Sequence, residues 1–369
     1  MFLIKTKRDD LLVPLQWVLG VVERRQTQAI LSNVLLEKIG DRLNLLATDN
    51  EIQIRTSCPV SGEGDGALTV SARKLQDILR ALPDALEISL SLNEKRLQIR
   101  SGKSRFSLQT LPPDDFPRMR LSTELPKKFT LSQKNFRQLL AKTQFSMATQ
   151  DVRYFLNGLL ILIENAHLSA VATDGHRLAY AGIPLDSDND SARQELILPR
   201  KTVSELHRLL ADNDDPLAIE ITANQVRFEF GNILLVSKLI DGKFPDYERV
   251  IPSELKNTIS LNKNDFLQSV IRAAILTSDK FRGVRLLLSE NTLKIITTNT
   301  DQEDAQEEIE LSYEGPFWDV GFNVSYLLDI LNYTTSETVN LSFNDGNSSV
   351  LLTIPDDAHF KYVVMPMRV

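Results

Sequence analysis

The stretch AVATDGHR, residues 170–177, contains the triplet ATD. The same triplet occurs at residues 47–49, and a diverged copy, TTN, occurs at residues 297–299. The threonines at the centre of the triplets are spaced by 125 residues in both steps. This regular spacing predicts one unit of roughly 120–125 residues, the size of an ordinary domain, repeated three times along the chain.

Each copy of the unit shows the same order of elements. An amphipathic helix comes first, an alternating strand ends in the triplet, a second helix follows, and a hairpin closes the unit. The six predicted helices cover residues 8–22, 73–82, 134–145, 200–210, 262–276 and 324–334. Because hairpins dominate, the sheets should be antiparallel and the fold class α+β, with three repeated domains.

Boundaries between the domains are expected where proline and charge interrupt the pattern. The two such places are residues 125–128 (LPKK) and residues 251–254 (IPSE). They divide the chain into a first domain of residues 1–125, a second of residues 127–252 and a third of residues 254–369.

Composition excludes several classes of protein. The chain has 369 residues, of which 42% are hydrophobic and 25% charged, as in an ordinary globular protein. Cys58 is the only cysteine, which excludes an internal disulfide framework and favours a cytoplasmic location. The four histidines show no metal-ligand spacing, so neither metal nor cofactor is expected. The longest apolar run, residues 158–163, is too short to cross a membrane.

Charge is distributed unevenly along the chain. The formal net charge is −7, which argues against a simple basic nucleic-acid binder. The six predicted helices nevertheless carry 12 Lys and Arg against 6 Asp and Glu. One interpretation is a set of solvated helix faces. The other is a basic surface that attracts a phosphate backbone without reading its bases. The numbers of charged residues do not decide between these two interpretations.

Several long motifs resemble those of bacterial DNA polymerase III beta subunits, the sliding clamps. They run from end to end of the chain and include RSGKSRFSL at residues 100–108, ATDGHRLA at 172–179, DGKFPDY at 241–247, KFRGVRL at 280–286 and VVMPMR at 363–368. The resemblance implies three similar domains per chain and two chains joined head to tail in a closed ring. It also implies that helices line the hole, sheets form the outside, and the ring encircles duplex DNA without catalysing a reaction.

The resemblance also implies a partner pocket between the second and third domains. Its walls are expected at Leu156, Thr173, Gly175, His176, Arg177, Leu178, Pro245, Arg249, Val250, Val363, Val364, Met365, Pro366, Met367 and Arg368. The expected partners are the DNA polymerase III alpha subunit, the clamp loader with its delta subunit, and other polymerases and repair proteins with clamp-binding motifs. Without the resemblance, Asp174 and Gly175 predict a tight turn, and the stretch from Val363 predicts a buried last strand.

Two further surfaces follow from the resemblance. Residues expected to face DNA are Arg24, Arg25, Arg73, Arg137, Gln150, Tyr154 and Lys201. Residues expected at the joint between the two chains are Lys74, Ile78, Lys103, Arg105, Phe106, Leu108, Ile275, Leu276, Glu303, Asp304 and Glu307. The sequence departs from the family at Phe155, where a tyrosine is common, so one hydroxyl contact to phosphate is absent there.

Two other classes of function compete with this interpretation. Asp174 and His176 lie two residues apart and could form a catalytic acid/base pair, although no nucleophile elbow, phosphate loop or metal set accompanies them. A repeat scaffold that does not bind DNA is the second alternative, and it would not be retained on circular DNA.

Overall fold

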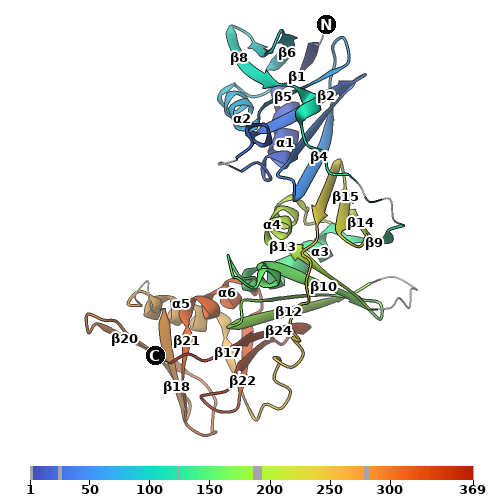
Figure 1. Cartoon of the computed structure of the whole chain (residues 1–369). Coiled ribbons are helices and arrows are strands. Elements are labelled where there is room, and N and C mark those ends of the chain that lie inside the picture. Colours follow the sequence, from blue (N-terminus) through green and yellow to red (C-terminus); the bar gives the residue numbers. More distant parts are fainter. Residues whose placement is uncertain are drawn as a thin grey trace. The chain divides into compact units, whose positions relative to one another are not determined.

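The computed structural model describes residues 3–23, 27–120, 122, 125–185, 193–277 and 282–368. The chain divides into two compact units, Met1–Arg137 with Lys201–Leu239 and Gln138–Arg200 with Ile240–Val369. The strands, which Figure 1 follows along the chain, form one sheet of twelve strands, one of eight and one of four in the described residues. Neighbouring strands pair antiparallel, which confirms the predicted class.

The first unit is built on the twelve-stranded sheet. Its strands in spatial order are β1 (Leu3–Lys7), β6 (Glu87–Asn93), β7 (Arg96–Ser101), β8 (Ser104–Leu111), β5 (Gly66–Ser71), β2 (Asn33–Ile39), β3 (Arg42–Thr48), β4 (Ile52–Pro59), β16 (Ile233–Lys238), β15 (Gln225–Phe230), β14 (Pro216–Ile221) and β9 (Lys127–Ser132). The sheet is continuous from the first repeat into the second because β4 pairs with β16, Arg55 opposite Leu234.

The second unit holds the other two sheets. The eight-stranded sheet runs β13 (Gln194–Pro199), β10 (Gly158–Glu164), β11 (His167–Thr173), β12 (Arg177–Pro184), β24 (Asp357–Val364), β23 (Val350–Ile354), β22 (Thr338–Phe343) and β17 (Asn257–Asn262). The four-stranded sheet runs β20 (Asp304–Glu310), β19 (Thr292–Thr298), β18 (Gly283–Ser289) and β21 (Trp318–Asn323). The second repeat joins the third where β12 pairs with β24, Leu178 opposite Val363.

The predicted repeat is present in the strands. The three strands that end at the triplets, β3, β11 and β19, are each seven residues long and begin 125 residues apart. Each pairs antiparallel with the strand before it, β2, β10 and β18 respectively. The spacing that the triplets gave in the sequence therefore reflects one fold repeated three times.

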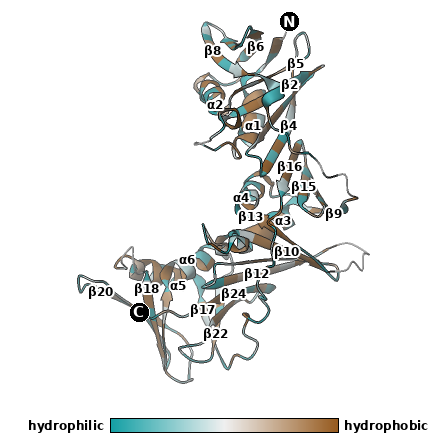
Figure 2. Ribbon diagram, viewed as in Figure 1, coloured by the Kyte–Doolittle hydropathy of each residue, from teal (hydrophilic) through white to brown (hydrophobic). Residues whose placement is uncertain are grey.

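Six α-helices lie in the described residues, at the six predicted places. They are α1 (Arg8–Leu19), α2 (Ala72–Ala81), α3 (Gln133–Thr143), α4 (Arg200–Leu209), α5 (Lys263–Ala274) and α6 (Val324–Tyr333). Helix α2 alternates between hydrophobic and hydrophilic residues (Figure 2), and only its inner face, with Leu75 and Leu79, is buried. In α5 and α6 an asparagine, Asn262 or Asn323, accepts hydrogen bonds from the first-turn N–H groups and fixes where the helix begins.

Helices α1 and α2, and likewise α5 and α6, pack in pairs against the sheets. Helix α1 packs on α2 and against β3 and β4, and its Leu11, Leu15 and Val18 are fully buried. Helix α5 packs on α6 and against β19 and β20 in the same way, with Phe266 and Val270 fully buried. Burial of these apolar faces is the main force that holds each repeat together.

Candidate binding pocket

A pocket of about 390 Å³ opens in the second unit. It is formed by the turn between β11 and β12, the loop after β16, and the C-terminal strand β24. Its lining residues are Arg153, Leu156, Thr173, Gly175, His176, Arg177, Leu178, Pro245, Tyr247, Arg249, Val250, Ser349, Val363 and Met365.

The turn at residues 174–176 is held by its own side chains. The Thr173 hydroxyl donates to the Arg177 carbonyl at 2.6 Å and accepts from the Gly175 N–H at 3.1 Å. The Asp174 carboxylate accepts from the main-chain N–H groups of His176 and Arg177, at 2.9 and 3.0 Å. Gly175 has a φ of +89°, a conformation that other residues adopt only with strain. The local sequence TDG therefore builds one rigid corner of the pocket.

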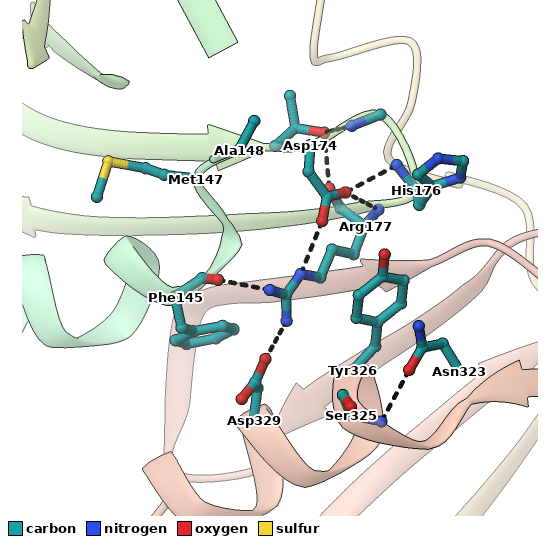
Figure 3. A network of polar contacts seen from close by, with 12 residues as sticks. Phe145, Met147, Ala148, Asp174, His176, Arg177, Asn323, Ser325, Tyr326 and Asp329 are labelled. Atoms are coloured by element: carbon teal, nitrogen blue, oxygen red, sulfur yellow. Dashed lines mark hydrogen bonds and ion pairs between the residues drawn. The ribbon is translucent and has the colours of Figure 1, made fainter. Parts of the chain in front are cut away.

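Arg177 is the centre of a polar network beneath this turn (Figure 3). Its guanidinium forms ion pairs with Asp174, at 3.2 Å, and with Asp329 of helix α6. It also donates to the carbonyl of Phe145 at 2.6 Å and lies 4.4 Å from the ring centroid of Tyr326. The side chain of Arg177 is only 10% exposed, so the network connects strand β12 to helix α6 through a largely buried charge.

The groups around Arg177 and Tyr326 shift the pKa values of both side chains upward. Burial alone would lower the pKa of Arg177, but Tyr362 and Asp329 outweigh it and raise that pKa above its ordinary value. Burial raises the pKa of Tyr326, and the neighbouring Asp174 adds to this effect. Arg177 is therefore a permanent cation and Tyr326 a neutral ring against it, which is the arrangement that a cation–π contact requires.

Arg153 stands at the mouth of the pocket and is held by Asp151. Its Nε and Nη2 atoms donate to the two Asp151 carboxylate oxygens at 3.0 and 2.9 Å. Hydrogen bonds from the Arg153 side chain and then from its main-chain N–H lower the pKa of Asp151 to about 2. Because this bidentate pair fixes the guanidinium plane, Arg153 presents an oriented cation beside Gly175.

The floor of the pocket is apolar. Leu156, Leu178 and Val363 are almost completely buried in a cluster that also contains Tyr247. Burial raises the pKa of Tyr247 to about 12, so this lining residue is neutral at physiological pH. At the rim, Met365 is 45% exposed and its N–H donates to the His176 carbonyl at 2.9 Å. The pocket thus combines an apolar floor, a flexible thioether and basic side chains at its edge.

The structure brings eleven of the fifteen predicted pocket residues together. Four predicted residues do not line the pocket. They lie next to the lining residues Val363 and Met365 and are Val364, Pro366, Met367 and Arg368. Val364 is fully buried, and the Met367 N–H donates to the Gly321 carbonyl instead. Three lining residues were not predicted. Tyr247 lies within the motif DGKFPDY, and Arg153 lies within a further stretch that resembles the family, QDVRY at residues 150–154. Ser349 lies in a turn with no distinguishing signal.

The Asp174–His176 pair does not have the geometry of an acid/base couple. The carboxylate of Asp174 is bound to the main-chain N–H of His176 and to the side chain of Arg177. The His176 imidazole forms no hydrogen bond to any described residue. The carboxylate therefore shapes the turn and does not orient the imidazole, as a catalytic partner would.

The residues predicted to face DNA differ in exposure and in whether their side chains already bind other residues of the chain. Arg24 and Arg25 lie outside the described residues. Gln150 and Tyr154 are exposed, Tyr154 by 58%. The remaining three are basic side chains already engaged in the first unit: Arg73 donates to the Val22 carbonyl, Arg137 to the His207 carbonyl, and Lys201 pairs with Glu23 and Asp49.

The residues predicted at the joint fall into two groups. In the first unit, Lys74, Lys103 and Arg105 are exposed, and Ile78, Phe106 and Leu108 are half-buried, on α2 and β8. In the second unit, Ile275 is 74% exposed and Leu276 half-buried directly after α5, and Glu303, Asp304 and Glu307 lie at or beside β20. Glu307 is paired with Arg272 at 2.5 Å, which lowers the pKa of Glu307.

Comparison with known proteins accounts for nearly the whole chain. Models of the N-terminal, central and C-terminal domains of the DNA polymerase III beta subunit match residues 1–120, 130–246 and 248–368. The chain belongs to the DNA polymerase III beta subunit family. The beta sliding clamp of Vibrio cholerae is 43% identical over 363 residues, 98% of each chain. The function of this chain is accordingly that of a sliding clamp.

Solved structures of this family have the same fold. The DNA polymerase III subunit beta of Pseudomonas aeruginosa is 41% identical, covers 100% of both chains and superposes with a TM-score of 0.94. A Pseudomonas aeruginosa sliding clamp solved bound to griselimycin is 42% identical, covers 100% of this chain and 99% of its own, and has a TM-score of 0.94.

The described residues contain neither a membrane-spanning helix nor a metal-binding cluster. None of their helices is long and apolar enough to cross a membrane. They contain no group of three or more His, Cys, Asp or Glu side chains placed to hold a metal ion.

Proposed function

We propose that two copies of the chain join head to tail into a closed ring around duplex DNA. The observation that supports this proposal is that two strands of the described part of the chain, β20 and β8, each leave main-chain groups unpaired along one side. Among the residues that the structure describes, strand β20 pairs only with β19, and β8 pairs with β7 but meets β5 only at its last two residues, Thr110 and Leu111. An open edge exposes main-chain donors and acceptors that a strand of a second copy can bind.

The side chains at these edges are complementary. Lys74, Lys103 and Arg105 are basic, whereas Glu303, Asp304 and Glu307 are acidic. Phe106 and Leu108 supply apolar surface that suits the exposed Ile275 and its neighbour Leu276. Contact between unlike patches is heterologous, and it forms a closed ring only if the rotation between copies permits it. The charges at the rim orient the two copies more than they stabilise the dimer.

The ring holds DNA by enclosure, with weak contacts to phosphates that permit sliding. Arg24, Arg25, Arg73, Arg137, Gln150, Tyr154 and Lys201 are the candidates for these contacts. Gln150 and Tyr154 are the most accessible of the described ones, while the ion pairs of Lys201 reduce the positive charge that it presents. Weak, sequence-independent contact suits a protein that must move along the duplex.

The pocket binds short peptides from partner proteins. Its apolar floor accommodates leucine and phenylalanine side chains, and the exposed Arg153 and Arg249 around it suit polar or acidic groups. The proposed partners are the polymerase alpha subunit, the clamp loader with its delta subunit, and repair proteins that carry clamp-binding motifs. A Pseudomonas aeruginosa sliding clamp has been solved bound to griselimycin, and this supports a ligand site on clamps of the family.

The remaining features of the proposal are the domain limits, the location and the absence of catalysis. We place the three clamp domains at residues 1–125, 127–252 and 254–369, and the protein in the cytoplasm. Tethering requires no catalytic group. Asp174→Asn should therefore leave clamp-dependent processivity largely intact, since an asparagine can still accept the two main-chain hydrogen bonds of the turn.

Loading onto nicked circular DNA tests the proposal. A closed ring should persist on the circle in high salt and should be lost when the circle is cut, because the linear product has free ends. Persistence on linear DNA in high salt would show that direct affinity, and not enclosure, holds the protein, and the proposal would then be wrong.

A further inference from the structure

The register of the sheets allows the helices of the three repeats to be matched residue by residue. In each repeat the first residue of a strand lies opposite the last residue before the second helix. The three pairs are Asn33 with Ser71, Gly158 with Pro199, and Gly283 with Asn323. Helices α2, α4 and α6 begin at the next residue. Asp77, Glu205 and Asp329 therefore occupy one equivalent position.

The first helix of each repeat can be matched in the same way. Helices α1, α3 and α5 begin directly after the strands β1, β9 and β17. The thirteenth residue counted from each helix start is Gly20, Phe145 or Ile275. These three residues therefore occupy a second equivalent position, just beyond the C-terminal end of the first helix.

At the junction of the first and second repeats, α4 closes the C-terminal end of α1. The Arg208 guanidinium donates to the Trp17 and Gln16 carbonyls, at 2.9 and 3.3 Å. Glu205 holds Arg208 by an ion pair of 2.5 Å. Its carboxylate also fills the space beside Gly20, where a Cβ would stand only 1.9 Å from the Oε2 atom. The last carbonyls of a helix have no partner within it, and here an arginine satisfies them.

The junction of the second and third repeats brings the same two positions together. Phe145 accepts a hydrogen bond from Arg177 at its carbonyl, and Asp329 forms an ion pair with the same guanidinium. The ring of Phe145 also packs on Tyr333 of α6, with 6.2 Å between the centroids. At both junctions within the chain, an acid on the second helix therefore pairs with an arginine that donates to main-chain carbonyls at the C-terminal end of the first helix or just beyond it.

The third set of equivalent residues has no such partner in the part of the chain that the structure describes. Asp77 and Arg80 repeat the spacing of Glu205 and Arg208 on α2, yet both are exposed and form no hydrogen bond or ion pair with the described residues. Ile78 is only half-buried, whereas the equivalent Leu206 and Ile330 are fully buried. At the other end, Ile275 is 74% exposed.

We propose that α2 of one copy closes the C-terminal end of α5 in a second copy, with Arg80 donating to the main-chain carbonyls of Ile271 and Arg272. Asp77 positions Arg80 and lies against Ile275. The sizes are complementary: at the first junction a long acid, Glu205, faces a glycine, and here a shorter acid faces an isoleucine. The inference rests on the proposed ring and assigns it a joint contact that the sheet edges and rim charges do not include.

Substitution of Arg80 tests the contact by dimer stability. Arg80→Ala should raise the dissociation constant of the dimer about tenfold or more, because it removes two charge-assisted hydrogen bonds, and sedimentation equilibrium measures this directly. Arg80→Lys should show a smaller rise, since lysine lacks the planar fork. Arg120→Ala is the matched control, as Arg120 is equally exposed and lies outside α2. No change in Arg80→Ala would overturn the inference.

A disulfide tests the geometry independently. The double variant Asp77→Cys with Ile275→Cys should link two chains under mild oxidation, and Arg120→Cys with Ile275→Cys should not. Cys58 is buried and does not compete. If the unmodified protein dimerises and stays on circular DNA but the first pair never links, the inference fails and the proposed function stands. A protein that stays monomeric at high concentration would overturn both.

Discussion

Arg177 and Asp329 form an ion pair that joins the wall of the binding pocket to helix α6. Arg177 lines the pocket on β12, and Asp329 lies on the second helix of the third repeat. The same guanidinium is held by Asp174 and by the carbonyl of Phe145. One side chain therefore fixes the pocket turn and the contact between the second and third repeats, so that pocket shape and stability are coupled.

Arg177→Ala should weaken both properties. It removes the guanidinium that pairs with Asp174 and Asp329 and lies on the ring of Tyr326, so the free energy of unfolding should fall by about 2 kcal/mol. Affinity for a clamp-binding peptide should fall at least tenfold. Denaturant unfolding and isothermal titration calorimetry measure the two effects.

Arg249→Ala provides the control for Arg177→Ala. The Arg249 side chain also lines the pocket but is 88% exposed, so its loss should reduce peptide affinity and leave the free energy of unfolding within about 0.5 kcal/mol. An Arg177→Ala protein of unchanged stability would contradict the coupling.

Sequence reasoning reached the repeat and its elements because both depend on local periodicity. The alternating strands before Thr48, Thr173 and Thr298 and the amphipathic helices after them are recognisable from spacing alone. Eleven of the fifteen residues that the family resemblance proposes for the pocket line the cavity of the second unit. Sequence reasoning could not tell that Lys201 and Arg73 are occupied by carbonyl and carboxylate partners, because those contacts join segments far apart in the chain.

The missed pocket residues show the same limit. Ser349 reaches the pocket only because β22 and β23 pair and bring their turn there, and nothing in the local sequence marks it. Val364 was predicted to line the pocket beside Val363. Side chains of successive strand residues point to opposite faces, and Val364 is buried on the other one.

Gly175→Ala should strain the pocket turn. The φ of +89° at this position is unfavourable for any residue with a Cβ, and the new methyl carbon would stand 3.1 Å from Nη2 of Arg153. We expect a loss of about 1–2 kcal/mol in the free energy of unfolding. Peptide affinity should fall as well, since Arg153 must move. Gly182→Ala on β12, the strand that follows this turn, is the control: its Cβ would meet only ordinary contacts, at 3.4 Å or more, and thermal unfolding should change little.

Removal of residues 365–369 should abolish partner binding and leave dimerisation intact. The truncation removes the Met365 side chain from the pocket rim and the hydrogen bonds that Met365 and Met367 donate to the His176 and Gly321 carbonyls. The proposed joint residues lie on α2, β8, β20 and the end of α5, and none of them is deleted. Analytical ultracentrifugation and a peptide-binding assay on the same sample separate the two functions, and a monomeric truncated protein would contradict the assignment of the joint.

Asp151 should keep its charge in strongly acidic solution. Its pKa is lowered to about 2, first by the side-chain hydrogen bonds from Arg153 and then by the Arg153 main-chain N–H. A lowered pKa in the folded state means that the pair contributes stability above the ordinary aspartate pKa, and that this contribution disappears as the pH falls towards 2.

Titration of the carboxyl carbon of Asp151 by NMR should therefore give a midpoint well below that of an ordinary aspartate. In Arg153→Ala the midpoint should rise but stay below the ordinary value, because the main-chain donor remains. A wild-type midpoint near the ordinary 3.8 would mean that Arg153 is not held in place at the pocket mouth.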